Sequence, residues 1–224
     1  MIRHVYENAS KALSHVYVAT DDDRIYQAVK SFGGRVVMTS SDHKSGTDRC
    51  DEAAEIAENS SGIKFKAVLN IQGDEPFINP GQIEQLKSCF TSEDTQIATL
   101  VKSITKSEDL FNENRPKVVI GSTNRALYFS RSVIPFKRGI PAEEWIRHHN
   151  YYLHIGLYGF RRDILPELTR LPQSALELAE SLEQLRWIEN GYTITVRVTE
   201  YESFGIDTPD DLKRLLESGS IAGL

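Results

Sequence analysis

Residues 15–40 read "HVYVATDDDRIYQAVKSFGGRVVMTS" and contain two different periodicities in succession. The β-branched and aromatic run at 15–20 predicts a strand. The stretch after the acids predicts a helix that Gly33 ends, and "RVVMTS" at 35–40 predicts a second strand. The apolar residues at helical spacing are Ile25, Ala28, Val29 and Phe32. A strand, a helix and a strand within this length predict a parallel pair joined by a crossover helix.

The same alternation continues along the chain. The pattern predicts helices at 47–59 and 80–90 with a strand at 66–74 between them, and Pro80 near the first turn of the second helix. Strands then follow with fewer helices over 97–160, where "GSTN" predicts a hairpin turn. The C-terminal part predicts a long helix at 175–191 with Leu178, Leu182 and Leu185 on its apolar face, a strand at 193–201 and a helix at 207–217.

These patterns predict one α/β domain over residues 1–224, built on a doubly wound, mostly parallel sheet. The segment around 97–160 is expected to add an antiparallel lobe.

Composition excludes several classes of function. The chain of 224 residues carries a net charge of −6, which argues against a general nucleic-acid binder. No apolar run is long enough to cross a bilayer, and no secretory signal is evident. Cys50 and Cys89 lack ligand partners at metal-binding spacing and are interpreted as ordinary thiols. We therefore expect a cytoplasmic protein that binds neither nucleic acid nor membrane.

Acids gather where predicted strands end. In "LNIQGDEPFI", residues 69–78, an apolar run breaks into Gln72, Asp74 and Glu75, and Asp207 follows the last predicted strand. Ligands bind beyond the carboxyl ends of parallel strands, so these acids are expected at one edge of the sheet. A divalent cation would offset their repulsion, and Mg²⁺ prefers one or two carboxylates together with phosphate oxygens. The alternative is that each acid is a turn residue or helix cap.

Six blocks occur in order along the chain: "DHKSGTDR", "NIQGDEPFI", "ALYFSRSVIPF", "HIGLYGF", "LEQLR" and "GIDTPDDL". Together they resemble the 3-deoxy-manno-octulosonate (Kdo) cytidylyltransferases. The resemblance implies a nucleotide-diphospho-sugar transferase-like fold and a homodimer. It also implies a Mg²⁺-dependent enzyme that joins CTP and Kdo into CMP-Kdo and pyrophosphate for lipopolysaccharide synthesis.

The resemblance also implies roles for individual residues. Asp74 and Asp207 would be the catalytic acids that bind Mg²⁺, while Glu75 is expected to cap the next helix or to face solvent. The nucleotide would contact Ser45, Gly46, Thr47, Arg49, Gln72 and Asp74. Thr47 is alternatively the N-cap of the helix at 47–59. The sugar would contact Arg131, His154, Tyr158, Glu183 and Gln184. A strand-end Arg, a core His and a solvated helix face are the alternatives for this second set.

Members of the family open with a strand and a glycine-containing loop of the kind "IPAR...PGKPL", which binds the triphosphate. The first residues here, "MIRHVYENASKA", instead match the helix that follows that loop. This difference leaves open that the chain is a catalytically silent remnant of the enzyme. A second alternative is a cytidylyltransferase for a related acid sugar, such as 8-amino-Kdo or sialic acid.

Overall fold

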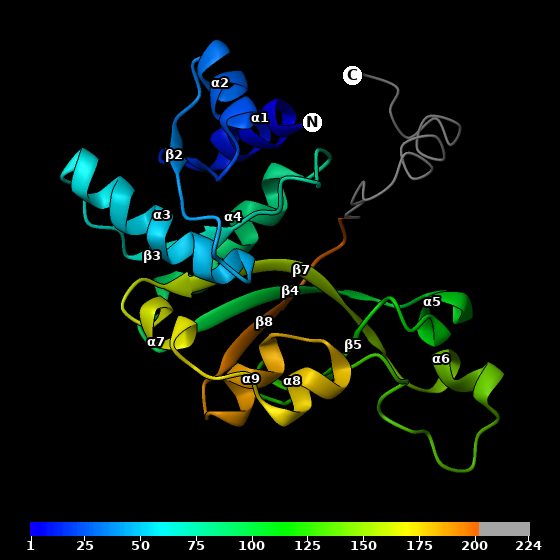
Figure 1. Cartoon of the computed structure of the whole chain (residues 1–224). Coiled ribbons are helices and arrows are strands. Elements are labelled where there is room, and N and C mark those ends of the chain that lie inside the picture. The colour runs from blue at the N-terminus through cyan, green and yellow to red at the C-terminus, as the bar shows by residue number, and fades with distance from the viewer. Residues whose placement is uncertain (202–224) are drawn as a thin grey trace.

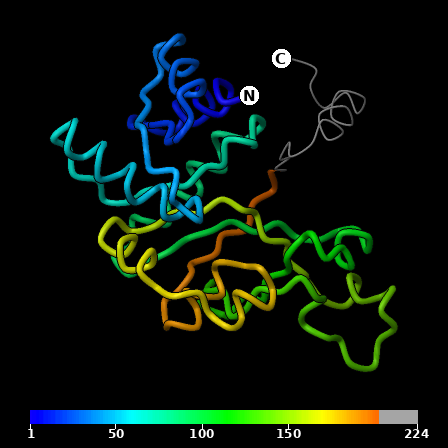
Figure 2. Tube along the Cα trace, in the orientation of Figure 1, coloured from blue at the N-terminus to red at the C-terminus, as the bar shows by residue number. Residues whose placement is uncertain are grey.

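The computed structural model describes residues 1–201. A six-stranded sheet has helices on both faces, and a two-stranded sheet stands apart from it (Figure 1). In the trace of Figure 2, residues 1–61, coloured blue to cyan, lie on one side of the large sheet. The predicted helix at 207–217, together with Asp207, lies outside the described residues. No helix among residues 1–201 has the length and apolar character that a membrane crossing requires.

The predicted strand, helix and strand at 15–40 are confirmed. The N-terminal elements are α1 (Ile2–Ala12), β1 (Val18–Thr20), α2 (Asp23–Ser31), β2 (Val36–Met38) and α3 (Gly46–Ser61). β1 and β2 are parallel. α2 begins where the Asp22 carboxylate accepts a hydrogen bond from the Arg24 N–H at 2.7 Å. It ends before Gly33, whose φ of +77° is the left-handed conformation that glycine adopts without strain.

The large sheet is mixed, and its longest strand organises it. Its strands are β3 (Ala67–Asn70), β4 (Ile97–Ser103), β5 (Lys117–Ile120), β6 (Ala126–Ser130), β7 (Tyr152–Arg161) and β8 (Ile194–Val198). The order is β6-β5-β7-β4-β8, and β3 also pairs with β7. β4 and β8 are parallel, whereas the pairs of β7 with β3, β4 and β5 are antiparallel, as is the β5–β6 hairpin.

The antiparallel strands predicted between 97 and 160 are present, and so is the predicted hairpin turn. Asn124 takes a φ of 57° in this turn, and the Gly121 N–H donates to the Arg125 carbonyl at 2.8 Å. β4 and β7 lie in the middle of the large sheet, so this segment continues the main sheet.

The other helices pack on the two faces of the large sheet or at its end. They are α4 (Pro80–Ser88), α5 (Ser107–Phe111), α6 (Trp145–His148), α7 (Leu165–Thr169), α8 (Ala175–Glu180) and α9 (Gln184–Glu189), with 3₁₀ turns at Cys89–Thr91 and Ala142–Glu144. In Figure 1, α3 and α4 lie above the sheet, α7, α8 and α9 lie below it, and α5 and α6 lie toward one end.

The prediction of one long helix at 175–191 is wrong. The chain breaks at Ser181, whose φ of 51° is left-handed, and continues as the separate helix α9. Glu180 explains where α8 ends, because its carboxylate accepts hydrogen bonds from the Ser130 hydroxyl at 2.6 Å and the Arg131 N–H at 2.9 Å. The reversal after Ser181 sends Leu182 into the core and leaves Leu178 62% exposed, so the expected single apolar face does not form.

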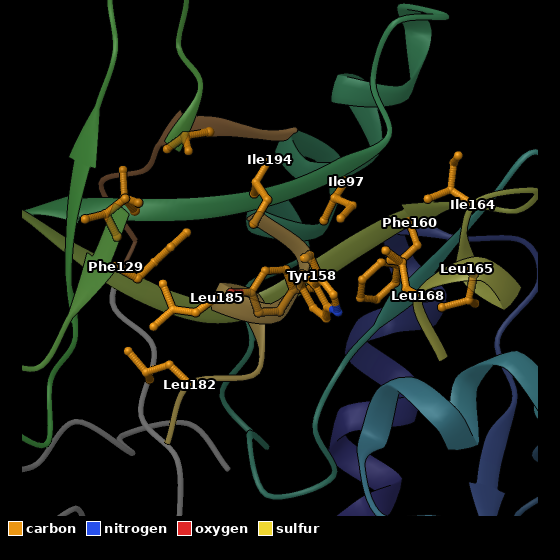
Figure 3. Packing of buried hydrophobic residues seen from close by; sticks show 14 residues of the cluster. Ile97, Phe129, Tyr158, Phe160, Ile164, Leu165, Leu168, Leu182, Leu185 and Ile194 are labelled. Carbon is orange, nitrogen blue, oxygen red and sulfur yellow. The ribbon is translucent and has the colours of Figure 1, made fainter. Parts of the chain in front are cut away.

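Alternation along β4 separates two hydrophobic cores. Ile97 and Val101 face one cluster, and Ala98 and Leu100 face the other. The first cluster packs the sheet against α7 and α9, and Figure 3 shows Tyr158 within it near Leu185. The second packs the sheet against α1 and α4. The residues on the two faces of β4 and β7 are therefore held by tight packing, which fixes the polar groups placed among them.

Candidate active site

The chain turns sharply after β3, where the predicted nucleotide and metal residues begin. The Glu75 N–H donates to the Gln72 carbonyl at 3.3 Å, and the Ile78 N–H donates to the Glu75 carbonyl at 3.1 Å. Asn79 is the N-cap of α4, and the Gln82 side chain accepts a hydrogen bond from the Asn79 N–H in return. The expected cap by Glu75 is therefore wrong. Asp74 and Glu75 are both half-buried.

The start of α3 lies against the end of β3. A Cβ on Gly46 would be 3.1 Å from Asn70 Nδ2 and 3.3 Å from Gln72 Nε2, so the short side chain permits this close approach. The N-cap is Ser45, whose hydroxyl accepts from the Asp48 N–H at 3.2 Å, so the alternative of a cap by Thr47 is wrong. Asn70 belongs to this group but was missed, because an Asn at a strand end looks like an ordinary turn residue.

Arg49 points from α3 toward the ends of β1 and β2. Its Nη1 donates to the Thr39 hydroxyl at 2.6 Å, and its Nη2 lies 3.4 Å from an Asp21 carboxylate oxygen. The Arg49 guanidinium therefore links α3 to Asp21, which follows β1, and to Thr39, which follows β2.

A cavity of about 270 Å³ joins these residues. Gly46, Arg49, Asn70 and Gln72 line it, and further residues of α1, α3, β1 and β3 and of the segments that follow α1 and β3 complete the lining. Three of the predicted nucleotide contacts thus share one cavity. Among residues 1–201, β1 pairs with β2 and β3 pairs with β7, and the cavity lies between the other edges of β1 and β3.

A hydrogen bond connects the nucleotide residues to the predicted sugar residues. The Thr47 hydroxyl donates to Glu183 at 2.8 Å across 136 residues of sequence. The other Glu183 oxygen accepts from Arg186 Nη2 at 2.7 Å, and Arg186 also lies 3.3 Å from Glu177. Arg186 is only 8% exposed, and this buried cation holds the Glu183 carboxylate in place. Its role was missed because Arg186 sits among apolar residues in the helix pattern.

The rings of His154 and Tyr158, both predicted sugar contacts, lie against each other. Their ring centroids are 5.1 Å apart, and Phe129 packs edge-on against His154. Burial lowers the pKa of His154 to about 3, so the imidazole is neutral at neutral pH. Burial, with a smaller contribution from Glu183, raises the pKa of Tyr158 well above its usual value. Within the described residues, the Tyr158 hydroxyl and Gln184 Nε2 are buried without hydrogen-bond partners.

The Arg131 guanidinium is already engaged with the main chain. Nε donates to the Glu180 carbonyl at 2.7 Å, Nη1 to the Glu113 carbonyl at 3.1 Å and Nη2 to the Ser181 carbonyl at 3.3 Å. Three of the five guanidinium N–H donors are used in this way, which leaves one on each Nη. Lys117, which sequence reasoning missed, donates from Nζ to the Arg131 carbonyl at 2.5 Å. Burial lowers the pKa of Lys117.

Half of the predicted metal site lies within the described part of the chain. Asp74 is there, whereas Asp207 lies outside it. Among residues 1–201, no group of three or more His, Cys, Asp or Glu side chains is placed to hold a metal ion. The Mg²⁺ site at Asp74 and Asp207 stays a prediction.

Known proteins resemble this chain over nearly all of its length. The sequence profile of the family described as cytidylyltransferase matches residues 1–196. The 3-deoxy-manno-octulosonate cytidylyltransferase of Parabacteroides distasonis is 56% identical over 220 residues, which are 96% of this chain and 86% of the relative. The enzyme of the same name from Bacteroides thetaiotaomicron is 57% identical over 97% of this chain and 86% of its own length.

Solved structures agree with these sequence matches. A CMP:2-keto-3-deoxy-manno-octonic acid synthetase in complex with CTP superposes with a TM-score of 0.86 at 37% identity, covering 98% of this chain and 88% of that one. A putative glucose-1-phosphate thymidylyltransferase from Bacillus anthracis, with a TM-score of 0.61 at 12% identity, shares the fold and confirms the predicted α/β class. The chain belongs to the 3-deoxy-manno-octulosonate cytidylyltransferase family.

Proposed function

We propose that the chain transfers CMP from CTP to Kdo, giving CMP-Kdo and pyrophosphate. The observation that carries this proposal is the Thr47–Glu183 hydrogen bond at 2.8 Å. It joins the predicted nucleotide residues, at the end of β3 and the start of α3, to the predicted sugar residues on β7 and α9. A nucleotide bound by the first set would therefore lie beside a sugar bound by the second set. The names of the relatives and the CTP complex of the similar synthetase support this function.

The first group suits a cytosine nucleotide. Asn70 and Gln72 supply amide donors and acceptors, and exposed Gly46 leaves the main chain open to close approach. Such groups can meet the mixed donor and acceptor edge of a pyrimidine. Ser45, Thr47 and Arg49 would support this surface: Ser45 caps α3, Thr47 holds Glu183 and Arg49 ties α3 to β1 and β2.

The second group suits a polyhydroxylated acid. The Tyr158 hydroxyl and Gln184 Nε2 are buried without partners among residues 1–201, and sugar hydroxyls would satisfy both. Glu183 supplies carboxylate acceptors for further hydroxyls. The two N–H groups of Arg131 that the main chain does not use would meet the sugar carboxylate.

In the proposed reaction the anomeric hydroxyl of Kdo attacks the α-phosphorus of CTP, and pyrophosphate leaves from the opposite side. Asp74 and Asp207 would hold Mg²⁺, whose preference for carboxylate oxygens fits this donor set. When bound, the ion would neutralise charge that develops on the phosphate oxygens. The side chains of the chain itself contribute by aligning the attacking hydroxyl with the phosphorus.

The wider setting is also proposed. We infer a homodimer through the segment 97–160, supported by the exposed apolar side chains of Phe136 (74%), Leu127 (58%) and Phe111 (49%). We further infer a cytoplasmic enzyme that serves lipopolysaccharide synthesis, supported by the names of the relatives and by the acid-sugar substrate that they imply.

The test is pyrophosphate release that depends on CTP, Mg²⁺ and Kdo. It is run on the 224-residue chain and on a form extended upstream of Met1, with 8-amino-Kdo and a sialic acid as competing acceptors. Turnover of Kdo above the other two acceptors supports the proposal. Preference for either of them would replace Kdo as the substrate, and no turnover in both forms would overturn the proposed activity.

Two variants separate nucleotide binding from the chemical step. Asn70→Ala should raise the KM for CTP by about tenfold with little change in the KM for Kdo, because one amide contact is lost. Asp74→Asn should lower kcat by about a hundredfold or more. Asn59→Ala and Asp23→Asn, at exposed helix positions, are the matched controls. A normal kcat in Asp74→Asn would remove Asp74 from the proposed mechanism.

A further inference from the structure

β7 contains an irregularity beside the predicted sugar residues. Thr99 of β4 pairs with Tyr158, but the next residue, Leu100, pairs with Ile155. One step along β4 therefore corresponds to three steps along β7, and Gly156 and Leu157 have no counterparts. This is a β-bulge, a feature that shortens a strand locally and redirects its side chains.

The bulge is what brings His154 and Tyr158 together. In a regular strand, residues four apart are separated by about 13 Å along the strand. Here their partners on β4 are Val101 and Thr99, which are two residues and about 7 Å apart along that strand, and the two rings lie with centroids 5.1 Å apart. The bulge adds two residues, an even number, so the two side chains stay on the same face of the sheet. The distance between them along the strand is shorter than in a regular strand.

Thr99 occupies the interior of this bulge. Its side chain is fully buried, and its hydroxyl oxygen lies 2.8 Å from the Leu157 carbonyl, 3.1 Å from the Ile155 carbonyl and 3.1 Å from His154 Nε2. A hydroxyl has one proton to donate and two lone pairs that accept. Both carbonyls can only accept, so the proton of Thr99 is directed to them, and toward His154 the oxygen can only accept. With this assignment of the hydroxyl proton, His154 Nε2 is the donor in the third contact and carries a proton.

We propose that Thr99 is a positioning residue that holds the bulge together and locks His154 in the tautomer protonated on Nε2. Nδ1 is then the only ring nitrogen that can accept a hydrogen bond. Any group of the sugar that meets His154 must be a donor, which selects a hydroxyl over an ether or carbonyl oxygen. The low pKa of His154 agrees with this assignment, because a doubly protonated ring would offer no acceptor. The recognition role rests on the proposed function, whereas the tautomer does not.

The tautomer is tested on the 224-residue chain without substrate. Long-range ¹H–¹⁵N correlation spectra at neutral pH, with His154 assigned by comparison with His154→Gln, report which ring nitrogen is protonated. We expect protonated Nε2 in the unmodified chain and in Thr99→Ser, which keeps the hydroxyl. Thr99→Val, which removes it, should shift His154 toward the other tautomer. Protonated Nδ1 in the unmodified chain would overturn the proposal even if Thr99→Val failed to fold.

The matched control is Thr95→Val. Thr95 is also buried, and its hydroxyl donates to the Cys89 carbonyl at 2.8 Å, away from His154. Thr95→Val and Thr99→Val remove comparable hydrogen bonds, but only Thr99→Val should change the His154 signals. Equal His154 signals in the two variants would show that Thr99 does not set the tautomer of His154.

Kinetics in the form that turns over then test recognition. Thr99→Val should raise the KM for Kdo about tenfold while the KM for CTP stays within about twofold, and Thr99→Ser should restore it. An unchanged KM for Kdo in a variant with the altered tautomer would overturn the role in recognition. If adding Kdo does not change the His154 and Tyr158 signals of the unmodified chain, these residues do not form the sugar site. The tautomer assignment does not depend on that result.

Discussion

Several buried side chains in this protein carry polar atoms that no other described residue satisfies. The Tyr158 hydroxyl lies in the hydrophobic core without a partner among residues 1–201, although burying an unpaired polar group costs about 1–3 kcal/mol. The proposed sugar would offset this cost by supplying the missing hydrogen bond. Gln184 Nε2, at the start of α9, is likewise buried without a partner among residues 1–201.

Replacing Tyr158 with Phe should therefore separate stability from function. We expect the free energy of unfolding to stay level or to rise by up to about 1 kcal/mol, because only an unsatisfied hydroxyl is removed. The KM for Kdo should rise about tenfold for loss of that contact. Urea unfolding and steady-state kinetics measure the two effects, and Tyr152→Phe, half-buried on the same strand, is the control. A large loss of stability would show that the hydroxyl has a partner in the folded protein.

His154 should make stability depend on pH. Its folded pKa of about 3 lies below the unfolded value near 6.5, so the unfolded chain binds a proton that the folded chain does not. The contribution of neutral His154 to the free energy of unfolding should be fully present above the unfolded pKa, and it should fall as the pH decreases toward 3. Between about pH 7.5 and pH 5 the loss due to His154 is at most about 2 kcal/mol. Urea unfolding of the parent chain and His154→Gln checks this, because the variant should show a smaller loss, and equal losses would contradict it.

At the level of single elements, short-range patterns predicted where the helices at 47–59, 80–90 and 175–191 begin better than where they end, and they did not predict α5, α6 or α7. The crossover helix α2 and the β5–β6 hairpin follow local signals and were predicted correctly. The break between α8 and α9 was not, since its cause is the contact of Glu180 with β6, which is about 50 residues away in sequence. Helix periodicity cannot register a contact of that kind.

The left-handed Ser181 offers a test of this break. Ser181→Gly should leave the free energy of unfolding unchanged or raise it by up to about 1 kcal/mol, because glycine adopts a φ of 51° without steric cost. Ser181→Val should lower it by about 1–2 kcal/mol, since a β-branched side chain is strained there. Urea unfolding of both variants measures the difference, and similar values for the two would mean that the break is not held in this conformation.

At the scale of the whole molecule, the two sheets face each other across the 270 Å³ cavity. In β1, the Val18 N–H donates to the Arg35 carbonyl at 2.9 Å, and alternation directs the Ala19 N–H away from β2. In β3, the bond from the Arg162 N–H to the Lys66 carbonyl at 3.0 Å sets the alternation that directs the Leu69 N–H away from β7. Both edges therefore present main-chain groups toward the cavity.

Amide hydrogen exchange should detect these two edges. We expect Ala19 and Leu69 to exchange at least about tenfold faster than Val18 and Val68, their neighbours on the bonded sides of the same strands. NMR-detected exchange on the 224-residue chain measures the four rates. Equal protection of neighbours would show that another segment pairs with these edges, and comparison with a form extended upstream of Met1 would show whether that segment precedes the chain.

The sequence by itself determined the α/β class, the elements of residues 15–40 and the candidate residues at the end of β3, because strand and helix periods and strand-end polar groups are local signals. Only the tertiary structure decided which residues meet. Asn70 against Gly46, Thr47 on Glu183 with Arg186 behind it, and Thr99 inside the β7 bulge all depend on contacts between distant parts of the chain. Packing and strand register set such contacts, and neither leaves a periodic trace in the sequence.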